Sequence, residues 1–190
     1  MNDPKRQKTC HKKVSTDANY SDHWGTPKCA YELLVPHVRH WQEVEHRKDT
    51  FTIWDPFFCK GHAKEYLEQV FGPLGATVIH SNAWVDITDT TIPEFAQNAD
   101  LIITNPPYSK TNKLDTTLWL KELGLPFFSI MPTEFMMAKK FRPHIEPFQF
   151  ICPSGRVRFE RDGVVAKTAP LSSTWYVCGV DLVRDISFCK

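Results

Sequence analysis

The chain has 190 residues, of which 42% are hydrophobic and 13% aromatic, and its formal net charge is +1. This size suits one ordinary domain with a substantial core. The near-balanced charge excludes a whole-molecule argument for a polyanionic partner, so such a partner must be recognised by local patches. No apolar run approaches the roughly 20 residues of a membrane span. With no signal peptide, the sequence predicts an intracellular protein without a membrane partner, nuclear or cytoplasmic in a eukaryote.

Two segments are predicted from composition. Residues 1–20 read as a basic flexible tail, because Lys and Arg are frequent there and no apolar periodicity is present. Residues 21–190 then form a single domain. The cysteines are scattered without a CxxC pair, which indicates reduced thiols. Cys59 and His62 come nearest to a metal pattern, but two ligands without a second pair predict no metal site.

Apolar runs alternate with helical patterns from about residue 50, which predicts an α/β fold with a mostly parallel central sheet. The predicted strands are 51–54, 76–80, 100–104 and 126–131. The first predicted helix, 62–71, has one apolar face made of Ala63, Tyr66, Leu67 and Val70. The second, 111–124, has Leu114, Leu118 and Leu123 at helical spacing and Gly124 as its C-cap.

The last third of the chain predicts antiparallel strands. Residues 156–167 read as two extended runs joined at Asp162-Gly163, a dipeptide typical of tight hairpins. The apolar run 173–183 adds another strand. The expected fold is therefore a mostly parallel sheet with a late antiparallel hairpin.

Chemistry is expected just after each strand, because ligands of open α/β sheets bind beyond the carboxyl ends of the strands. Asp55 and Gly61 flank the turn after the first strand, and Gly61 lets a ligand approach the backbone. Asn82 and Asp86 follow the second strand. Asn-Pro-Pro-Tyr, residues 105–108, follows the third.

The Asn-Pro-Pro-Tyr segment suits an amino group attached to a conjugated system. Its prolines fix the backbone, so the carbonyls keep set directions. The side-chain oxygen of Asn105 and the carbonyl of Pro106 can both accept hydrogen bonds from one NH₂, while Tyr108 offers a ring for stacking. Such an amine is a weak nucleophile, and accepting both its hydrogens pulls the nitrogen towards tetrahedral geometry. This frees the lone pair.

Together these motifs resemble the S-adenosylmethionine-dependent amino-methyltransferases, above all those acting on adenine N6. The residues are Asp-Pro-Phe at 55–57, Asp86 and the segment 105–108, and the resemblance covers about residues 22–180. Trp-Gly-Thr-Pro at 24–27 and Gly-Arg-Val-Arg-Phe at 155–159 are similar to motifs of phage-type adenine methyltransferases. The resemblance implies a Rossmann-like methyltransferase fold.

The resemblance also implies a role for each motif. The target amine is held by the catalytic residues Asn105, Pro106, Pro107 and Tyr108. S-adenosylmethionine is bound by Trp24, Gly25, Thr26, Pro27, Asp55, Pro56, Phe57, Gly61, Asn82 and Asp86. Two departures from the family pattern predict weaker cofactor affinity. Cys59 replaces a glycine of the first turn, and the second strand ends at His80 without the acid that holds the ribose hydroxyls.

Basic side chains in several loops predict a phosphate-binding rim, with a solvated strand edge as the alternative for Arg156 and Arg158. The full set is Lys110, Lys113, Lys139, Lys140, Arg142, Arg156 and Arg158. The predicted activity is N6-adenine methylation of DNA or RNA. The chain has no room for a large target-recognition domain, so a protein partner supplying specificity is one option. The alternatives are a protein glutamine N-methyltransferase and a weakly active nucleic-acid-binding subunit of a methyltransferase complex.

Overall fold

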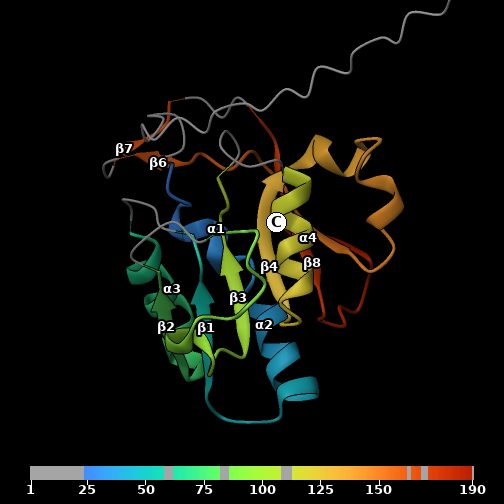
Figure 1. Ribbon diagram of the computed structural model, residues 1–190. Coiled ribbons are helices and arrows are strands. Elements are labelled where there is room, and N and C mark those ends of the chain that lie inside the picture. The colour runs from blue at the N-terminus through green and yellow to red at the C-terminus, as the bar shows by residue number, and fades with distance from the viewer. Residues whose placement is uncertain are drawn as a thin grey trace, which may run out of the picture.

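A seven-stranded sheet forms the centre of the protein (Figure 1). The computed structural model describes residues 24–57, 62–81, 86–107, 113–161, 164–167 and 171–189. The strands are β1 (Phe51–Asp55), β2 (Ala76–His80), β3 (Leu101–Thr104), β4 (Phe127–Pro132), β5 (Gln149–Pro153), β6 (Glu160–Arg161), β7 (Val164–Val165), β8 (Ser173–Cys178) and β9 (Ile186–Cys189). The α-helices are α1 (Lys28–Glu32), α2 (Val35–Trp41), α3 (Ala63–Phe71) and α4 (Lys113–Glu122). A π-helical turn (Gln42–His46) and short 3₁₀ turns (Gly72–Leu74, Glu94–Ala96, Thr133–Met137, Arg142–His144) connect them.

The sheet is mostly parallel, as the sequence predicts. Its order is β2-β1-β3-β4-β8-β5-β9, and only β8 runs antiparallel to its two neighbours. The carboxyl ends of β1, β2, β3 and β4 therefore meet at one edge of the sheet, and β5 ends at the same edge. Gly75, with φ of +89°, makes the turn that brings β2 beside β1, and a Cβ there would collide with the Asp49 carbonyl.

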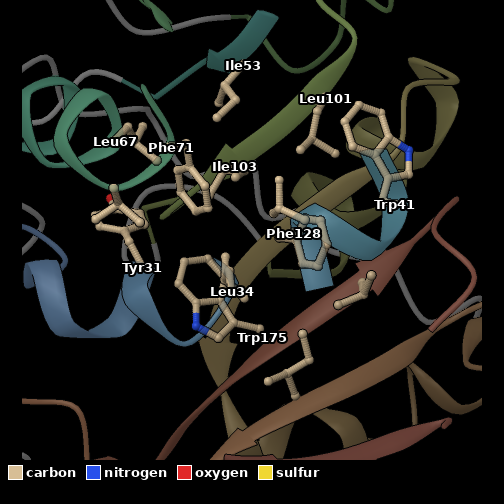
Figure 2. Packing of buried hydrophobic residues seen from close by; sticks show 14 of the residues in the cluster. Tyr31, Leu34, Trp41, Ile53, Leu67, Phe71, Leu101, Ile103, Phe128 and Trp175 are labelled. Carbon is tan, nitrogen blue, oxygen red and sulfur yellow. The ribbon is translucent and has the colours of Figure 1, made fainter. Parts of the chain in front are cut away.

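Two hydrophobic layers cover the two faces of the sheet, because successive strand residues point to opposite sides. On the first face, α1, α2 and α3 pack Tyr31, Trp41 and Phe71 against Ile53 and Phe128 (Figure 2). The second layer belongs to α4 and to the segment between β4 and β5. Its buried residues include Trp54, Ile102, Trp119, Leu120, Phe135, Phe141 and Tyr176.

The predicted helices and the predicted strands of the central sheet are confirmed, with a correction to part of one helix face. The α3 face of Ala63, Leu67 and Val70 is buried as expected. On α4 the buried residues are Thr116, Thr117, Trp119 and Leu120. Of the leucines expected on one face, Leu123 is buried, whereas Leu114 and Leu118 are only partly buried. The segment ends as predicted, with Gly124 at φ of +73°.

The predicted hairpin is present but lies outside the central sheet. β6 and β7 pair antiparallel as a separate two-stranded sheet above the carboxyl ends of the strands (Figure 1). Residues 156–159 are not in a strand, which corrects the extended run expected there, although Val157 is buried between exposed Arg156 and Arg158. The antiparallel strand of the central sheet is β8, formed by the run predicted over 173–183.

Among the described residues, no helix has the length and apolar character needed to cross a bilayer.

Candidate active site

Three neighbouring strands end in side chains that contact one another. The register of β1 and β2 places Asp55 beside His80, and their Oδ2 and Nε2 atoms lie 3.7 Å apart. Thr104, at the end of β3, donates its hydroxyl to Asp55 Oδ1 over 2.6 Å. The Phe57 amide makes a longer contact of 3.4 Å with the same oxygen, across the first turn. The carboxyl group is thus fixed at the centre of this edge of the sheet.

Burial changes the protonation of Asp55. Only 2% of the residue is exposed, and this desolvation raises the pKa of its carboxyl from 3.8 to about 7, although the bonds from Thr104 and Phe57 act in the opposite direction. Burial also lowers the pKa of His80, and the nearby charge of Lys64 adds to the effect. Near neutral pH the site therefore pairs an uncharged imidazole with a carboxyl group close to its midpoint of titration.

Asn105 is oriented by a long-range hydrogen bond. Its Nδ2 donates to the carbonyl oxygen of Trp24 over 2.9 Å. Because a carbonyl can only accept, this bond fixes which end of the amide faces Trp24 and sets Oδ1 on the opposite side. Pro106 and Pro107 follow as buried residues. In the described part of the chain, no hydrogen bond reaches the Pro106 carbonyl.

The segment that holds Asn105 is itself anchored to the β6–β7 hairpin. Gly25 and Glu160 exchange two backbone hydrogen bonds of 2.7 and 2.8 Å. The Glu160 carboxylate accepts a further bond of 3.0 Å from the Tyr66 hydroxyl on α3. The Arg161 guanidinium lies over the Trp24 ring, 5.6 Å from its centroid. The sequence-predicted segment 24–27 is therefore brought against the Asn-Pro-Pro elbow, residues 105–107.

Thr26 carries a buried hydroxyl at the same edge of the sheet. The residue is 2% exposed, and within the described residues its Oγ1 makes no hydrogen bond. A buried, unsatisfied hydroxyl costs free energy, so such groups in a loop at a binding edge point to a ligand. The Thr26 hydroxyl can form a hydrogen bond, and the Asp55 carboxyl becomes negative when it loses its proton near neutral pH. These two groups fit a polar, cationic cofactor such as S-adenosylmethionine.

Three polar residues at the end of β2 or after it, His80, Ser81 and Asp86, make local contacts. His80 turns towards Asp55, and Ser81 accepts a 3.2 Å bond from the Trp54 indole, so both take part in the packing of β1 against β2. Asp86 is exposed and accepts bonds from the amide and hydroxyl of Thr88, which lower its pKa. Its Oδ1 stabilises its own turn, and its contact with a cofactor stays a prediction.

Other predicted residues lie at the same edge or outside the described residues. Pro56 and Phe57 are buried after β1, and the Phe57 ring meets Trp119 edge-on at 5.7 Å. The positions outside the described residues are Gly61, Asn82, Tyr108 and Lys110. Among the described residues, no group of three His, Cys, Asp or Glu side chains has the arrangement of a metal site.

The predicted basic residues fall into two groups instead of one patch. Lys113 begins α4, and Lys139, Lys140 and Arg142 lie between β4 and β5, all on the side of the second hydrophobic layer. Arg156 and Arg158 flank Val157, which packs in the first layer with α1 and α3. The two groups flank the carboxyl edge from opposite faces of the sheet.

Sequence reasoning missed three residues of this arrangement: Thr104, Tyr66 as a hydroxyl donor, and Glu160. Thr104 had a usable signal, because it is the last strand residue before Asn105, and a polar residue ending an apolar strand faces the same edge. Glu160 had none, since its pairing with Gly25 depends on how distant segments pack.

The fold defined by this sheet is shared with a known methyltransferase structure. The chain aligns with the methyltransferase subunit of a type I restriction-modification system from Streptococcus thermophilus at a TM-score of 0.59 and 10% sequence identity. The alignment covers 87% of this chain and 47% of that subunit, so this chain spans about half of its length. The chain matches no protein-family model, and no curated protein sequence is significantly similar to it. The Rossmann-like α/β fold predicted from the sequence is confirmed.

Proposed function

We propose that this protein is an S-adenosylmethionine-dependent N6-adenine methyltransferase acting on DNA or RNA. The observation that carries the proposal is the placement of Asn105: it directly follows β3 at the carboxyl edge, its amide is oriented by Trp24, and it lies next in the chain to Thr104, which binds the buried Asp55. The methyltransferase fold of the structural neighbour supports it.

The elbow would prepare the amine for attack. Asn105 Oδ1 and the Pro106 carbonyl would each accept a hydrogen bond from one of the two N–H groups of the exocyclic amine, which weakens the conjugation of its lone pair with the ring. Methyl transfer then forms an N–C bond as the C–S bond of the sulfonium breaks, and the surplus amine proton leaves to solvent. Because Trp24 already fixes the Asn105 amide, little ordering remains when the substrate binds.

The cofactor, when bound, supplies the electrophilic methyl group. The residues proposed to hold it are those of the segment 24–27, with the Thr26 hydroxyl as a hydrogen-bonding group, and those of the first turn from Asp55 to Phe57. Gly61, Asn82, Tyr108 and Asp86 remain part of the proposal on the motif alone. Asp55 provides a negative charge near a cationic ligand once it loses its proton.

A nucleic-acid substrate is favoured over a protein substrate by the basic residues on both sides of the edge. The neighbour is a subunit of a restriction-modification system, which supports a DNA substrate and a partner subunit that provides specificity. Adenine in a duplex must leave the stack before the elbow can accept its amine.

The test is transfer of a tritiated methyl group from S-adenosylmethionine to separate pools of DNA, RNA and protein, followed by nucleoside and amino-acid analysis. The proposal expects label in N6-methyladenine. Label in N-methylglutamine would replace it with the protein-directed activity, and no label from a protein that binds the cofactor would favour an inactive subunit.

A further inference from the structure

A groove lies beyond the carboxyl end of β5, between α1 and the chain that follows the strand. Its volume is about 660 Å³. Its walls are partly apolar, and the apolar residues include Pro27, Ala30, Leu33, Pro153, Val157 and Val165. The backbone of Gly155 also lines it, and a Cβ at that position would meet no atom within 4 Å. The groove is therefore open above Gly155.

The charged residues of the groove are mostly cationic. Of the described residues that line it, Lys28, Arg156 and Arg158 are basic and only Glu160 is acidic. The Glu160 carboxylate already accepts the hydroxyl of Tyr66, and its backbone is paired with Gly25. The field in the groove therefore favours an anionic occupant.

The groove and the elbow are joined by one short segment. Trp24 binds Asn105, and Pro27, three residues later, lines the groove. Glu160 lines the groove as well and pairs with Gly25 between them. A chain lying in the groove would thus leave it close to the residues that hold the target amine.

We propose that this groove binds the single-stranded stretch of nucleic acid that flanks the target adenine. The inference rests on the proposed function and names its substrate class. Cationic rims beside apolar walls suit an unpaired strand, whose phosphates contact Arg and Lys while its base faces meet apolar side chains. A volume of about 660 Å³ lies within the range of ligand pockets.

Two variants test the groove in different ways. Arg156→Ser with Arg158→Ser removes both arginines, whereas Gly155→Leu keeps the charge and fills the open space above the backbone. The control is Arg39→Ser with Arg184→Ser, which removes the same charge from exposed positions outside the groove. Arg39 lies on α2, and Arg184 immediately precedes the residue that bonds to the start of β5, both remote from the carboxyl edge.

The measurement is fluorescence anisotropy with labelled adenine-containing oligonucleotides, as single-stranded RNA, single-stranded DNA and duplex DNA, over a range of salt. Each groove variant is expected to bind single strands at least about tenfold more weakly, while the control stays within about twofold of wild type. The arginine variant should also reduce the magnitude of the slope of log K against log salt concentration by about 1.4, the value for two phosphate contacts on a single strand. The RNA and DNA arms identify which strand is preferred.

Cofactor binding by calorimetry and methyl transfer are measured on the same proteins. Unchanged single-strand affinity in both groove variants would overturn the groove assignment, whether or not the wild type transfers methyl groups. Tighter binding of duplex than of single strands, or of an acidic glutamine-containing peptide than of either, would overturn it as well. If the groove variants weaken binding but the wild type shows no transfer, the groove stands and the proposed activity fails.

Discussion

The protonation of Asp55 gives a quantitative prediction of stability against pH. Its carboxyl is 2% exposed, and burial raises its pKa from 3.8 to about 7. Between these values the folded protein keeps a proton that the unfolded chain has released, so stability falls as pH rises through this window and the stabilising effect is lost above about pH 7. The full shift corresponds to roughly 4 kcal/mol, at 1.36 kcal/mol for each pH unit.

The perturbation is Asp55→Asn, which removes the titration and keeps an oxygen able to accept the bond from Thr104. Between about pH 5 and about pH 7.5, the free energy of unfolding of the wild type is expected to fall by roughly 2 to 3 kcal/mol more than that of the variant. His80, whose Nε2 lies 3.7 Å from this carboxyl, is present in both proteins.

Urea denaturation at both pH values, followed by tryptophan fluorescence, measures the difference. Asp86→Asn is the matched control, because Asp86 is exposed and its pKa is lowered by Thr88. Asp86 is therefore ionised in both states above about pH 5, and its variant should follow the wild-type profile. Parallel profiles of wild type and Asp55→Asn would refute the reasoning.

Three further predictions address the cofactor segment and the core. Thr26→Val keeps the shape but removes the buried hydroxyl, and calorimetry should give a cofactor affinity about tenfold weaker with stability unchanged or raised; equal affinity would remove Thr26 from the site. Tyr66→Phe removes the bond to Glu160 and should cost about 1 kcal/mol in denaturant unfolding, with no additional loss in a variant that already carries Glu160→Ala, which removes the acceptor, if the pair acts through that bond. Phe128→Ala should cost about 3–5 kcal/mol by the same assay, because the ring is fully buried in the first hydrophobic layer, and a loss under about 1 kcal/mol would contradict that packing.

The parallel part of the fold was predictable because its strands have strong local signals. Phe51, Ile53 and Leu101 belong to short apolar runs bounded by turn residues, and these runs became β1 and β3. The helix α3 was equally clear from the spacing of Ala63 and Leu67. Local pattern and tertiary packing agree in these elements, so the pattern alone was enough.

Other elements depend on contacts that local pattern does not contain. β9 is an edge strand of four residues whose apolar side chains, Ile186 and Phe188, are exposed, so its place in the sheet depends on pairing with β5 and not on burial. On α4 the buried Thr116 and Thr117 carry no hydrophobic signal, so of the leucine spacing only Leu123 marked the buried side. Here tertiary packing overrides the periodicity.

The candidate site likewise combines residues that the sequence predicted with contacts that depend on tertiary packing. The positions of Asp55 and Asn105 followed from the rule that chemistry lies at the carboxyl ends of strands. The bond from Asn105 to Trp24, and the anchoring of Trp24 through Gly25 and Glu160, join segments far apart in the chain. Motif spacing identified the segments, but only their packing orients the amide.

The central claim is that the elbow at residues 105–107 presents acceptors to a conjugated amine beside the methyl donor. The most direct measurement compares wild type with Asn105→Ala in single-turnover methyl transfer to adenine-containing nucleic acid, with cofactor affinity measured on both. The variant is expected to bind the cofactor with wild-type affinity but to transfer methyl groups at least about 100-fold more slowly. Transfer at the wild-type rate by Asn105→Ala would contradict it.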